Sequence, residues 1–538
     1  MARMAMIGAV AAAILAATAG ATRFNVLATG PAYNNVRVVR EDAAGQPLPG
    51  FESPSVLAVA EYNDTMFVTG WDVMKIETSA AFPDEQQAYA AGYFEGTQTS
   101  QKAIDHYNNN YPSGPPPQYA VDFLLNHTTW LEAQLAGMPT KDPYWTQVSL
   151  MWKQWQGLFD GINAAPGPNM TKAELLVLTS LGDMFDIIPG LKPESRPNWR
   201  KMPKHEYMQW FAAQTHCTSL FKVTEDLKDI FFGHVAWNKL VTMMRIFKHM
   251  TLNYNAAGTT AKTITMSSYP GLLSSFDDFY QTDSGLAVIE TSLAVLNTSM
   301  YDGNIRPDLL LYWMRVMVAN RMATSAPEWA SLVAYLNSGT YNNQWMVLDM
   351  NKFTPGKPLV KDTMWVAEQM PGIVASQDVT EMLRYGYYPS YNVPMNKTLF
   401  ELGGYPEAVA VHGPEMNSYQ RCVRAQIFRR DQTSVTDLAS YKHMMQYNNF
   451  EADPISNGNP LFAISSRVDL DPHHPQCFGA IDAKVSSYSL WKQGMLTHAH
   501  SGPTPQQPTF GFNTTWAPCT QHAGLVEMYQ FGWEIMKP

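Results

Sequence analysis

The sequence predicts an α+β fold. Segments in which apolar and polar residues alternate, as they do in strands, are interspersed with long segments whose apolar residues recur at helical spacing. Hydrophobic residues make up 46% of the 538 residues and charged residues 16%, so the chain can bury a large core. This length suits roughly two to four domains or one large α+β body.

The first part of the chain is predicted to hold strands and then helices. Residues 36–75 alternate between apolar and polar side chains and are broken by turn residues, which indicates two or three strands. Residues 191–205 are rich in Pro, Arg and Lys and are predicted to form an exposed linker that is open to processing. Apolar residues at helical spacing predict helices over residues 84–111, 121–135, 144–163 and 172–188.

The stretch that organises the chain is residues 214–240. Its two apolar runs, separated by a charged turn, predict a β-hairpin, and Cys217 stands where the first strand begins. The small hydroxyl residues Thr218 and Ser219 follow. This setting suits a reachable nucleophile, although a single cysteine in a long chain is more often a small buried hydrophobic residue.

The elements after the hairpin are less regular. Residues 239–253 fit either a strand or a helix, and residues 309–336 are predicted to be helical. From residue 391 onward we expect mostly loops with short strands. Strands are predicted at residues 263–268, 286–297 and 343–351, and residues 364–375 form another apolar segment.

The N-terminus has the pattern of a secretory signal peptide over residues 1–21. Arg3 precedes a short, Ala-rich apolar run, and small residues follow. The run is short for a membrane span, which needs ~20 apolar residues. We therefore expect a soluble protein of the secretory pathway, lysosomal or extracellular, without an integral membrane span. Acceptor motifs for N-linked glycans support this expectation; they occur at Asn63, Asn126, Asn169, Asn297, Asn396 and Asn513.

Charge and missing motifs narrow the function. The net charge of −10 argues against a nucleic-acid partner, because phosphate binding needs a basic face. The chain has no GxSxG, HExxH or GxGxxG motif, and its adjacent histidines, His473 and His474, have no evident third ligand. We predict neither a metal nor a cofactor. The sequence is compatible with a homodimer.

The cysteines number only four and include no CxxC pair. If Cys217 is a free nucleophile, at most two of the remaining three can pair. Cys477 and Cys519 are the better candidates for a disulfide because both lie in polar segments that contain proline, and Cys422 would then stay reduced.

Several blocks together resemble the phospholipase B-like family, which belongs to the N-terminal-nucleophile hydrolase superfamily. They follow one another across most of the chain. The blocks are residues 90–96, 215–220, 267–271, 341–345, 368–372, 424–432, 444–449, 464–470 and 536–538, together with Gly233, His234, Trp237, Glu290 and Thr291. The resemblance implies an αββα sandwich, in which two stacked antiparallel sheets lie between helical layers.

The resemblance also implies a precursor that cuts itself between His216 and Cys217. The cut would separate residues 22–216 from a catalytic fragment, residues 217–538, and the two fragments would stay associated. Cys217 would then carry both a nucleophilic thiolate and a free α-amine. An α-amine has an ordinary pKa of ~7.7–8.0, which suits a general base near neutral pH.

Further site residues follow from the same resemblance. Asn392 matches an amide that stabilises the oxyanion, and Arg424 matches an arginine that can hold the amine or a substrate anion. His234 and Trp237 match a pocket pair, and Thr291 matches a hydroxyl that faces the nucleophile. His234 is equally well explained as a hydrogen-bonded histidine of the core, and Thr291 as an ordinary strand residue.

Three functions remain open at this point. The first is a hydrolase of acyl ester or amide bonds in (phospho)lipids. The second is an amidase that acts on peptide-like or other small amides. The third is a non-enzymatic lysosomal glycoprotein that binds lipid and uses the constellation only to cut itself.

Overall fold

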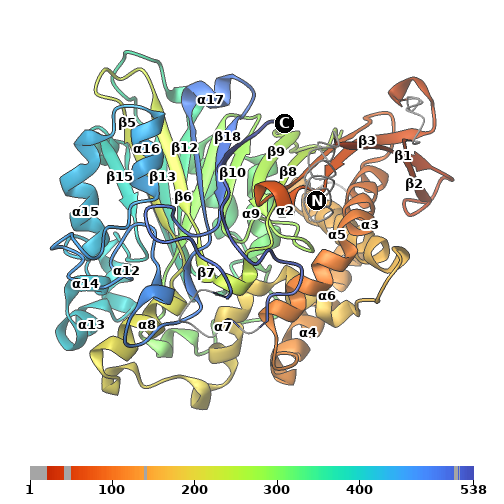
Figure 1. Ribbon diagram of the computed structural model, residues 1–538. Helices are drawn as coiled ribbons and strands as arrows, with labels where there is room; N and C mark the ends of the chain where they lie inside the picture. Colours follow the sequence, from red (N-terminus) through yellow and green to blue (C-terminus); the bar gives the residue numbers. More distant parts are fainter. Residues whose placement is uncertain (1–20, 42–49, 138–141, 514–518, 520) are drawn as a thin grey trace, which may run out of the picture.

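Two stacked β-sheets form the centre of the molecule in a computed structural model that describes residues 21–41, 50–137, 142–513, 519 and 521–538 (Figure 1). The predicted signal peptide lies outside the described residues, apart from residue 21. The larger sheet has 11 strands in the order β14-β13-β12-β11-β10-β9-β8-β4-β3-β1-β2. They are β1 (Thr22–Ala28), β2 (Val36–Arg40), β3 (Val56–Asn63), β4 (Asp72–Thr78), β8 (Ile246–Thr251), β9 (Thr263–Ser268), β10 (Phe279–Thr282), β11 (Leu286–Ser292), β12 (Asn343–Asp349), β13 (Met364–Met370) and β14 (Ile373–Asp378).

The smaller sheet has 6 strands in the order β15-β5-β6-β17-β18-β19. They are β5 (Thr218–Val223), β6 (Ile230–Val235), β15 (Tyr387–Ser390), β17 (Asp482–Ser487), β18 (Thr497–Ser501) and β19 (Trp533–Met536). The predicted hairpin is therefore confirmed as β5 and β6, which pair in antiparallel register. A separate pair is formed by β7 (Trp237–Lys239) and β16 (Phe478–Ala480).

The inner faces of the two sheets share one apolar core. Phe221 and Phe232 of the smaller sheet are buried together with Ile289 and Met346 of the larger one. All pairs between these strands are antiparallel except β4 with β8, which run parallel. Burying one face of each sheet against the other is what holds such sandwiches together.

Helices cover the outer faces and complete the αββα arrangement (Figure 1). On the larger sheet α3 (Asp84–Asn110) packs against β3 and β4, and α10 (Ala326–Ala334) packs against β12 and β13. On the smaller sheet α16 (Leu438–Met445) packs against β6 and β17. The other long helices are α4 (Gln118–Gly137), α5 (Pro143–Ala164), α7 (Leu181–Leu191), α8 (Lys204–Gln214) and α9 (Tyr312–Met322).

Glycine allows α3 and α5 to approach each other closely. A Cβ atom on Gly92 of α3 would lie 1.9 Å from the backbone oxygen of Gln154. A Cβ atom on Gly157 of α5 would lie 2.1 Å from the backbone oxygen of Tyr89. Residues with a side chain at these positions would force the helices apart. Helix packing therefore explains the glycine in the sequence block of residues 90–96.

The predicted elements are confirmed in the first part of the chain and less so later. Residues 172–188 form two helices, α6 (Lys172–Thr179) and α7, and residues 309–336 form α9 and α10. The break before α10 follows from Pro327 in its first turn, since proline cannot continue a preceding helix. The linker at residues 191–205 is largely exposed as predicted, although Trp199 within it is buried.

The prediction of mostly loops with short strands from residue 391 onward is confirmed for most of residues 446–538 but misses the helices before them. Helices occupy much of residues 397–445. Each has only 4 to 9 residues, which is too short to display a clear helical period. They are α12 (Lys397–Leu402), α13 (Tyr405–His412), α14 (Pro414–Asn417), α15 (Val423–Asp431) and α16.

The predicted disulfide between Cys477 and Cys519 is present, with a Cα–Cα distance of 5.3 Å. Cys217 and Cys422 are free and buried. Because the bond closes a loop with a sequence separation of 42, we expect the Cys477→Ser/Cys519→Ser variant to lose about 2–5 kcal/mol of unfolding free energy. Denaturant unfolding measures this change. An unchanged midpoint and slope would show that the bond does not stabilise the fold.

The glycan acceptor motifs differ in their exposure. Asn126, Asn169 and Asn513 are exposed, whereas Asn63, Asn297 and Asn396 are half-buried. The Asn297 amide also donates to the Leu402 carbonyl at 2.9 Å. We therefore expect glycans first at the exposed asparagines. Glycosidase treatment of the natively produced protein should lower its mass, and Asn126→Gln/Asn169→Gln should remove part of that shift. No mass change on treatment would contradict the secretory prediction.

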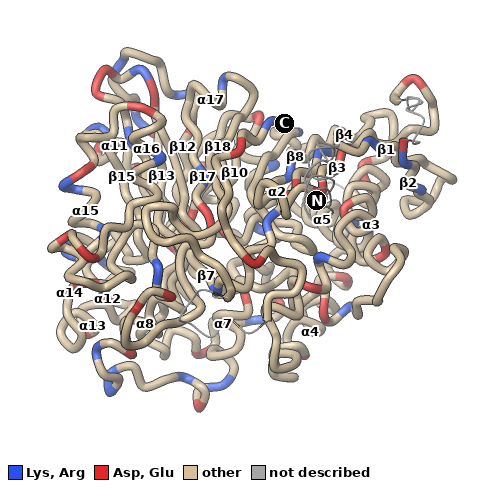
Figure 2. The backbone as a smooth tube through the Cα atoms, viewed as in Figure 1, with Lys and Arg blue, Asp and Glu red and all other residues tan. Residues whose placement is uncertain are grey.

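Among the described residues, no helix is both long and apolar enough to cross a membrane. Lys and Arg are interspersed with Asp and Glu along the chain, as Figure 2 shows for this view.

Candidate functional site

Cys217 lies at the junction between α8 and β5, where the backbone is strained. Its side chain is buried, and its φ angle is 97°. A residue with a Cβ atom rarely adopts a positive φ, and such conformations cost about 1–3 kcal/mol. Cutting the peptide bond between His216 and Cys217 would therefore relieve backbone strain at Cys217.

The carbonyl oxygen of His216 is surrounded by hydrogen-bond donors. The side-chain amide of Asn392 donates to it at 2.8 Å, and the backbone N–H of Ser292 donates at 3.3 Å. The Ser292 hydroxyl is a further donor at 3.4 Å. Donors fixed around a carbonyl oxygen stabilise the negative charge that forms there when a nucleophile attacks the carbon. The His216 carbonyl oxygen thus has three hydrogen-bond donors within 3.4 Å.

Arg424 of α15 fixes both Asn392 and Cys217. Its Nη1 donates at 2.8 Å to Oδ1 of Asn392 and at 2.8 Å to the Cys217 carbonyl. The guanidinium also lies 4.4 Å from the centre of the Trp237 ring, a cation–π distance. Burial lowers the pKa of Arg424 to about 10, so the group stays charged at neutral pH. Because Oδ1 accepts from arginine, the NH₂ group of Asn392 points at His216.

The thiol of Cys217 has an acidic neighbour, Glu290 of β11. The Sγ atom lies 3.9 Å from Oε1 of Glu290, which also accepts a hydrogen bond of 3.2 Å from Tyr341. Burial and then the charge of Glu290 raise the pKa of the Cys217 thiol well above its ordinary value. Burial and then Asp278 raise the pKa of Glu290 as well. The uncut chain thus holds a protonated thiol.

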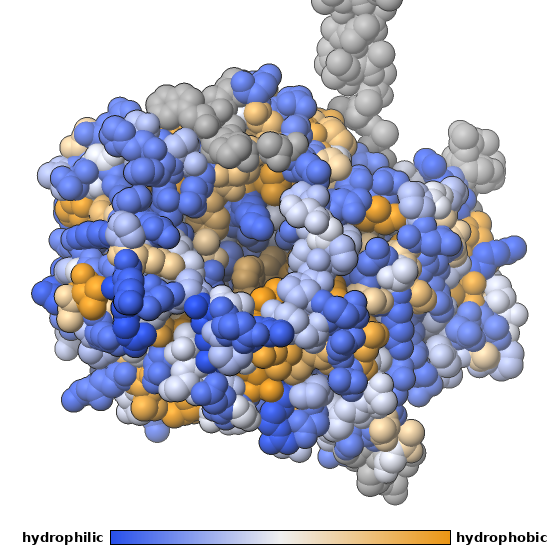
Figure 3. All heavy atoms as spheres, turned by 90° about the horizontal axis from the view of Figure 1, so that it is seen from below, coloured by the Kyte–Doolittle hydropathy of each residue, from blue (hydrophilic) through white to orange (hydrophobic). Residues whose placement is uncertain are grey.

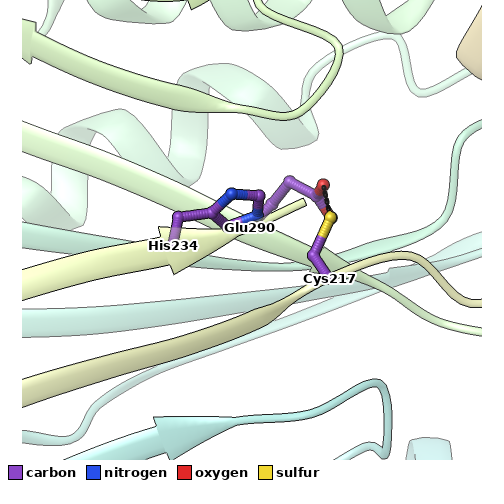
Figure 4. Close-up of side chains that lie close together, drawn as sticks. All are labelled: Cys217, His234 and Glu290. Carbon is purple, nitrogen blue, oxygen red and sulfur yellow. Dashed lines mark hydrogen bonds between the residues drawn. The ribbon is translucent and has the colours of Figure 1, made fainter. Parts of the chain in front are cut away.

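His234 of β6 lies beside these two groups, as Figure 4 shows. Its side chain is fully buried, and neither ring nitrogen has a hydrogen-bond partner among the described residues. Burial and then the charge of Lys484 lower the pKa of His234 well below its ordinary value. His234 is therefore a neutral imidazole with an available lone pair.

The structure brings most of the predicted site residues together. His216, Cys217, Asn392, Arg424 and Trp237 form one connected group, in which the Trp237 carbonyl lies 2.8 Å from Nδ1 of His216. The Thr291 residue was expected to face the nucleophile. Its hydroxyl lies 2.6 Å from the hydroxyl of Ser390 and accepts from the backbone N–H of Asn392 at 3.3 Å.

Glu290 and Ser292 are site residues to which the sequence analysis gave no role. Successive side chains of a strand point to opposite faces, so Glu290 and Ser292 share one face of β11 and Thr291 takes the other. The sequence did contain a signal, because residues 290–292 read Glu-Thr-Ser within a predicted strand. Because residues two apart in a strand lie on the same face, this strand pattern predicts that Glu290 and Ser292 lie side by side.

A small cavity of about 50 Å³ adjoins His216. Its lining includes Phe185 of α7, Trp210 of α8 and Leu293, with Arg196 at its polar side. Figure 3 views the molecule from the side on which α7 and α8 lie in Figure 1, and it shows a hollow bordered by both hydrophilic and hydrophobic side chains. Residues that precede the His216–Cys217 bond thus form part of the cavity wall.

Comparison with known proteins identifies the family. The family model for phospholipase B matches residues 58–536. Phospholipase B-like 1 of Rattus norvegicus is 37% identical over 488 residues, which cover 89% of this chain and 87% of that protein. Phospholipase B of Crotalus adamanteus is 36% identical over 494 residues, covering 89% and 88%. A solved structure of penicillin V acylase from Agrobacterium tumefaciens overlaps with a TM-score of 0.28 and 12% identity, covering 53% of this chain and 83% of that one. The chain belongs to the phospholipase B family of hydrolases.

Proposed function

We propose that the chain cuts itself between His216 and Cys217 and then uses Cys217 as an N-terminal nucleophile to hydrolyse acyl ester or amide bonds in (phospho)lipids. The observation that carries this proposal is the set of donors from Asn392 and Ser292 around the His216 carbonyl, next to a buried cysteine with φ of 97°. An ordinary structural cysteine needs neither feature.

The self-cleavage conserves atoms and charge. The Cys217 sulfur attacks the carbonyl carbon of His216, a C–S bond forms and the C–N bond to Cys217 breaks. The thiol proton passes to the departing nitrogen. Water then hydrolyses the thioester: its OH goes to the His216 carbonyl carbon and its hydrogen to the sulfur. The acid proton on His216 passes to the α-amine, which leaves a carboxylate on His216 and both a thiol and a protonated α-amine on Cys217. Glu290, whose Oε1 lies 3.9 Å from the sulfur, can take the thiol proton in transit.

The same donors can then serve an external substrate. Before the cut, the His216 acyl group occupies the position in which a substrate acyl group would react. Once His216 withdraws, the amide of Asn392 and the groups of Ser292 are free to receive a substrate carbonyl oxygen. Arg424 continues to hold the Cys217 carbonyl, so the new N-terminus keeps its place.

The fold supports continued association of the two fragments, residues 22–216 and 217–538. Strands β1 to β4 precede the cut, yet they belong to the same sheet as β8 to β14, which follow it. The junction is the β4–β8 pair, from Asp72 with Ile246 to Glu77 with Thr251. Separating the fragments would expose this sheet edge and the apolar core beneath it, at a cost well above that of a single contact.

The substrate class is inferred from the relatives, which carry phospholipase B in their names. The cavity beside His216, about 50 Å³, is too small to hold an acyl chain while His216 occupies the site. One observation favours the amidase alternative, because the bond held in the site is itself an amide. We place the enzyme in the secretory pathway, lysosomal or extracellular, on the strength of the signal pattern and glycan motifs.

A substrate panel tests this function. Purified, cut protein is incubated with phospholipid vesicles, with N-acyl amino acids and with short peptide amides, and released fatty acid or amine is measured. We expect fatty acid from the lipids, and none from the Cys217→Ala chain. Release from the peptide amides alone would favour the amidase, and lipid binding without any release would favour a non-enzymatic glycoprotein.

A further inference from the structure

The Cys217 thiol, the His234 imidazole and the Glu290 carboxylate converge on one point inside the sandwich (Figure 4). One ligand atom from each lies within 4.8 Å of the other two, and all three residues are buried. They come from both sheets, since His234 is on β6 and Glu290 is on β11. Neither nitrogen of His234 has a hydrogen-bond partner among the described residues, although its side chain is 0% exposed.

A neighbouring cluster of carboxylates does not compete for the same role. Asp277 and Asp482 also approach His234, but their charges are already balanced. Lys484 lies 2.5 Å from Asp277 and 2.7 Å from Asp482, and Arg245 lies 2.5 Å and 2.8 Å from them. A divalent cation there would have to displace two buried cations. The thiol–imidazole–carboxylate group makes no ion pair with any residue that the structure describes.

We propose that Cys217, His234 and Glu290 of the uncut chain bind one thiophilic divalent cation of the Zn²⁺ type, and that this cation blocks self-cleavage. Thiolate, neutral imidazole and carboxylate are the donors that zinc takes, at ~2.3 Å from sulfur and ~2.0–2.2 Å from nitrogen and oxygen. Atoms at those distances around a tetrahedral centre lie closer together than 4.8 Å, so binding would draw the three side chains together.

The cation would inhibit self-cleavage because it binds the sulfur electron pair that attacks His216. Binding releases the thiol proton to water, and the sulfur lone pair that would attack the His216 carbonyl is engaged by the metal. The carboxylate of Glu290 is engaged too, which removes the nearby proton acceptor. The inhibitory part of this inference rests on the proposed self-cleavage, whereas metal binding itself does not.

A cobalt titration tests the binding. Asn392→Gly chain, which we expect to cut about 10²–10³-fold more slowly than the wild type, is purified uncut and metal-free and titrated with Co²⁺ alone. The expected result is one Co²⁺ per chain with a thiolate-to-cobalt absorption band. The band should be lost with Cys217→Ala, and His234→Gln should weaken binding at least tenfold. Each of these substitutions is made in the Asn392→Gly chain. The matched control is Cys422→Ala in that chain, which removes the other free buried cysteine and should keep the band.

A folded chain that shows no band would refute the proposed cation site. So would a band that survives Cys217→Ala and disappears with Cys422→Ala. Circular dichroism tests whether each variant is folded. If His234→Gln does not fold, Glu290→Gln serves as the second ligand variant.

The block is tested on the wild-type chain synthesised in zinc-buffered and in chelator-treated cell-free extracts. We expect zinc to slow the appearance of the two fragments at least tenfold and EDTA to restore it. An unchanged rate in the presence of bound metal would refute the inhibitory role. If Cys217→Ala is cut at the same bond as the wild type, self-cleavage itself is wrong, while the cobalt band on the wild-type thiol remains. The two failures are therefore distinguishable.

Discussion

Replacing Cys217 with alanine is expected to leave the chain as a single polypeptide without hydrolase activity. The thiol is the only group proposed to attack the His216 carbonyl, so its loss removes the nucleophile for both the cut and the later turnover. The substitution removes one buried sulfur atom and leaves the donors to the His216 carbonyl in place. Intact-mass measurement and fatty-acid release detect the two effects separately.

Two further variants serve as a conservative substitution and as a control for this result. Cys217→Ser keeps a hydroxyl that can perform the same acyl shift, so we expect slow cutting. Cys422→Ala is the matched control, because Cys422 is equally buried and free but lies at the start of α15, and it should cut at the wild-type rate. Cutting of Cys217→Ala at the wild-type bond would mean that an external protease makes the cut.

The second large effect is expected at Asn392. Its NH₂ group donates to the His216 carbonyl, and removal of one such donor typically lowers a rate by about 10²–10³-fold. Asn392 has a φ of 69°, so alanine would add backbone strain and glycine is the cleaner substitution. We therefore expect Asn392→Gly to cut about 10²–10³-fold more slowly, as followed by the uncut fraction over time.

The matched control for Asn392→Gly is Asn457→Gly. Asn457 also has a positive φ, 50°, but it is exposed and outside the site. It should leave the cutting rate unchanged. If Asn392→Gly cuts normally, or loses its cut only because it unfolds at a much lower temperature, the amide is a structural partner and not an oxyanion donor.

The local parts of this fold could be predicted from the sequence because their signals are local. The hairpin that carries Cys217 has an apolar run on each side of a charged turn, and each of its strands is 6 residues long. The short helices between residues 397 and 445 could not be recognised in the same way, because one or two turns do not establish a period.

The site itself depends on contacts between distant segments. Asn392 is 176 residues from His216 along the chain, and Arg424 is 207 residues from Cys217. No spacing rule links such positions, so only the family resemblance predicts them as site residues. The strain at Cys217 and the pairing of Glu290 with the thiol are properties of the folded backbone.

The N-terminal residue of the large fragment tests the central claim most directly. The purified, active protein is separated into its fragments, and the larger one is analysed by N-terminal sequencing and intact mass. Self-cleavage predicts that it begins at Cys217 with a free α-amine and ends at Pro538. An active enzyme whose large fragment begins at any other residue would contradict the N-terminal-nucleophile account.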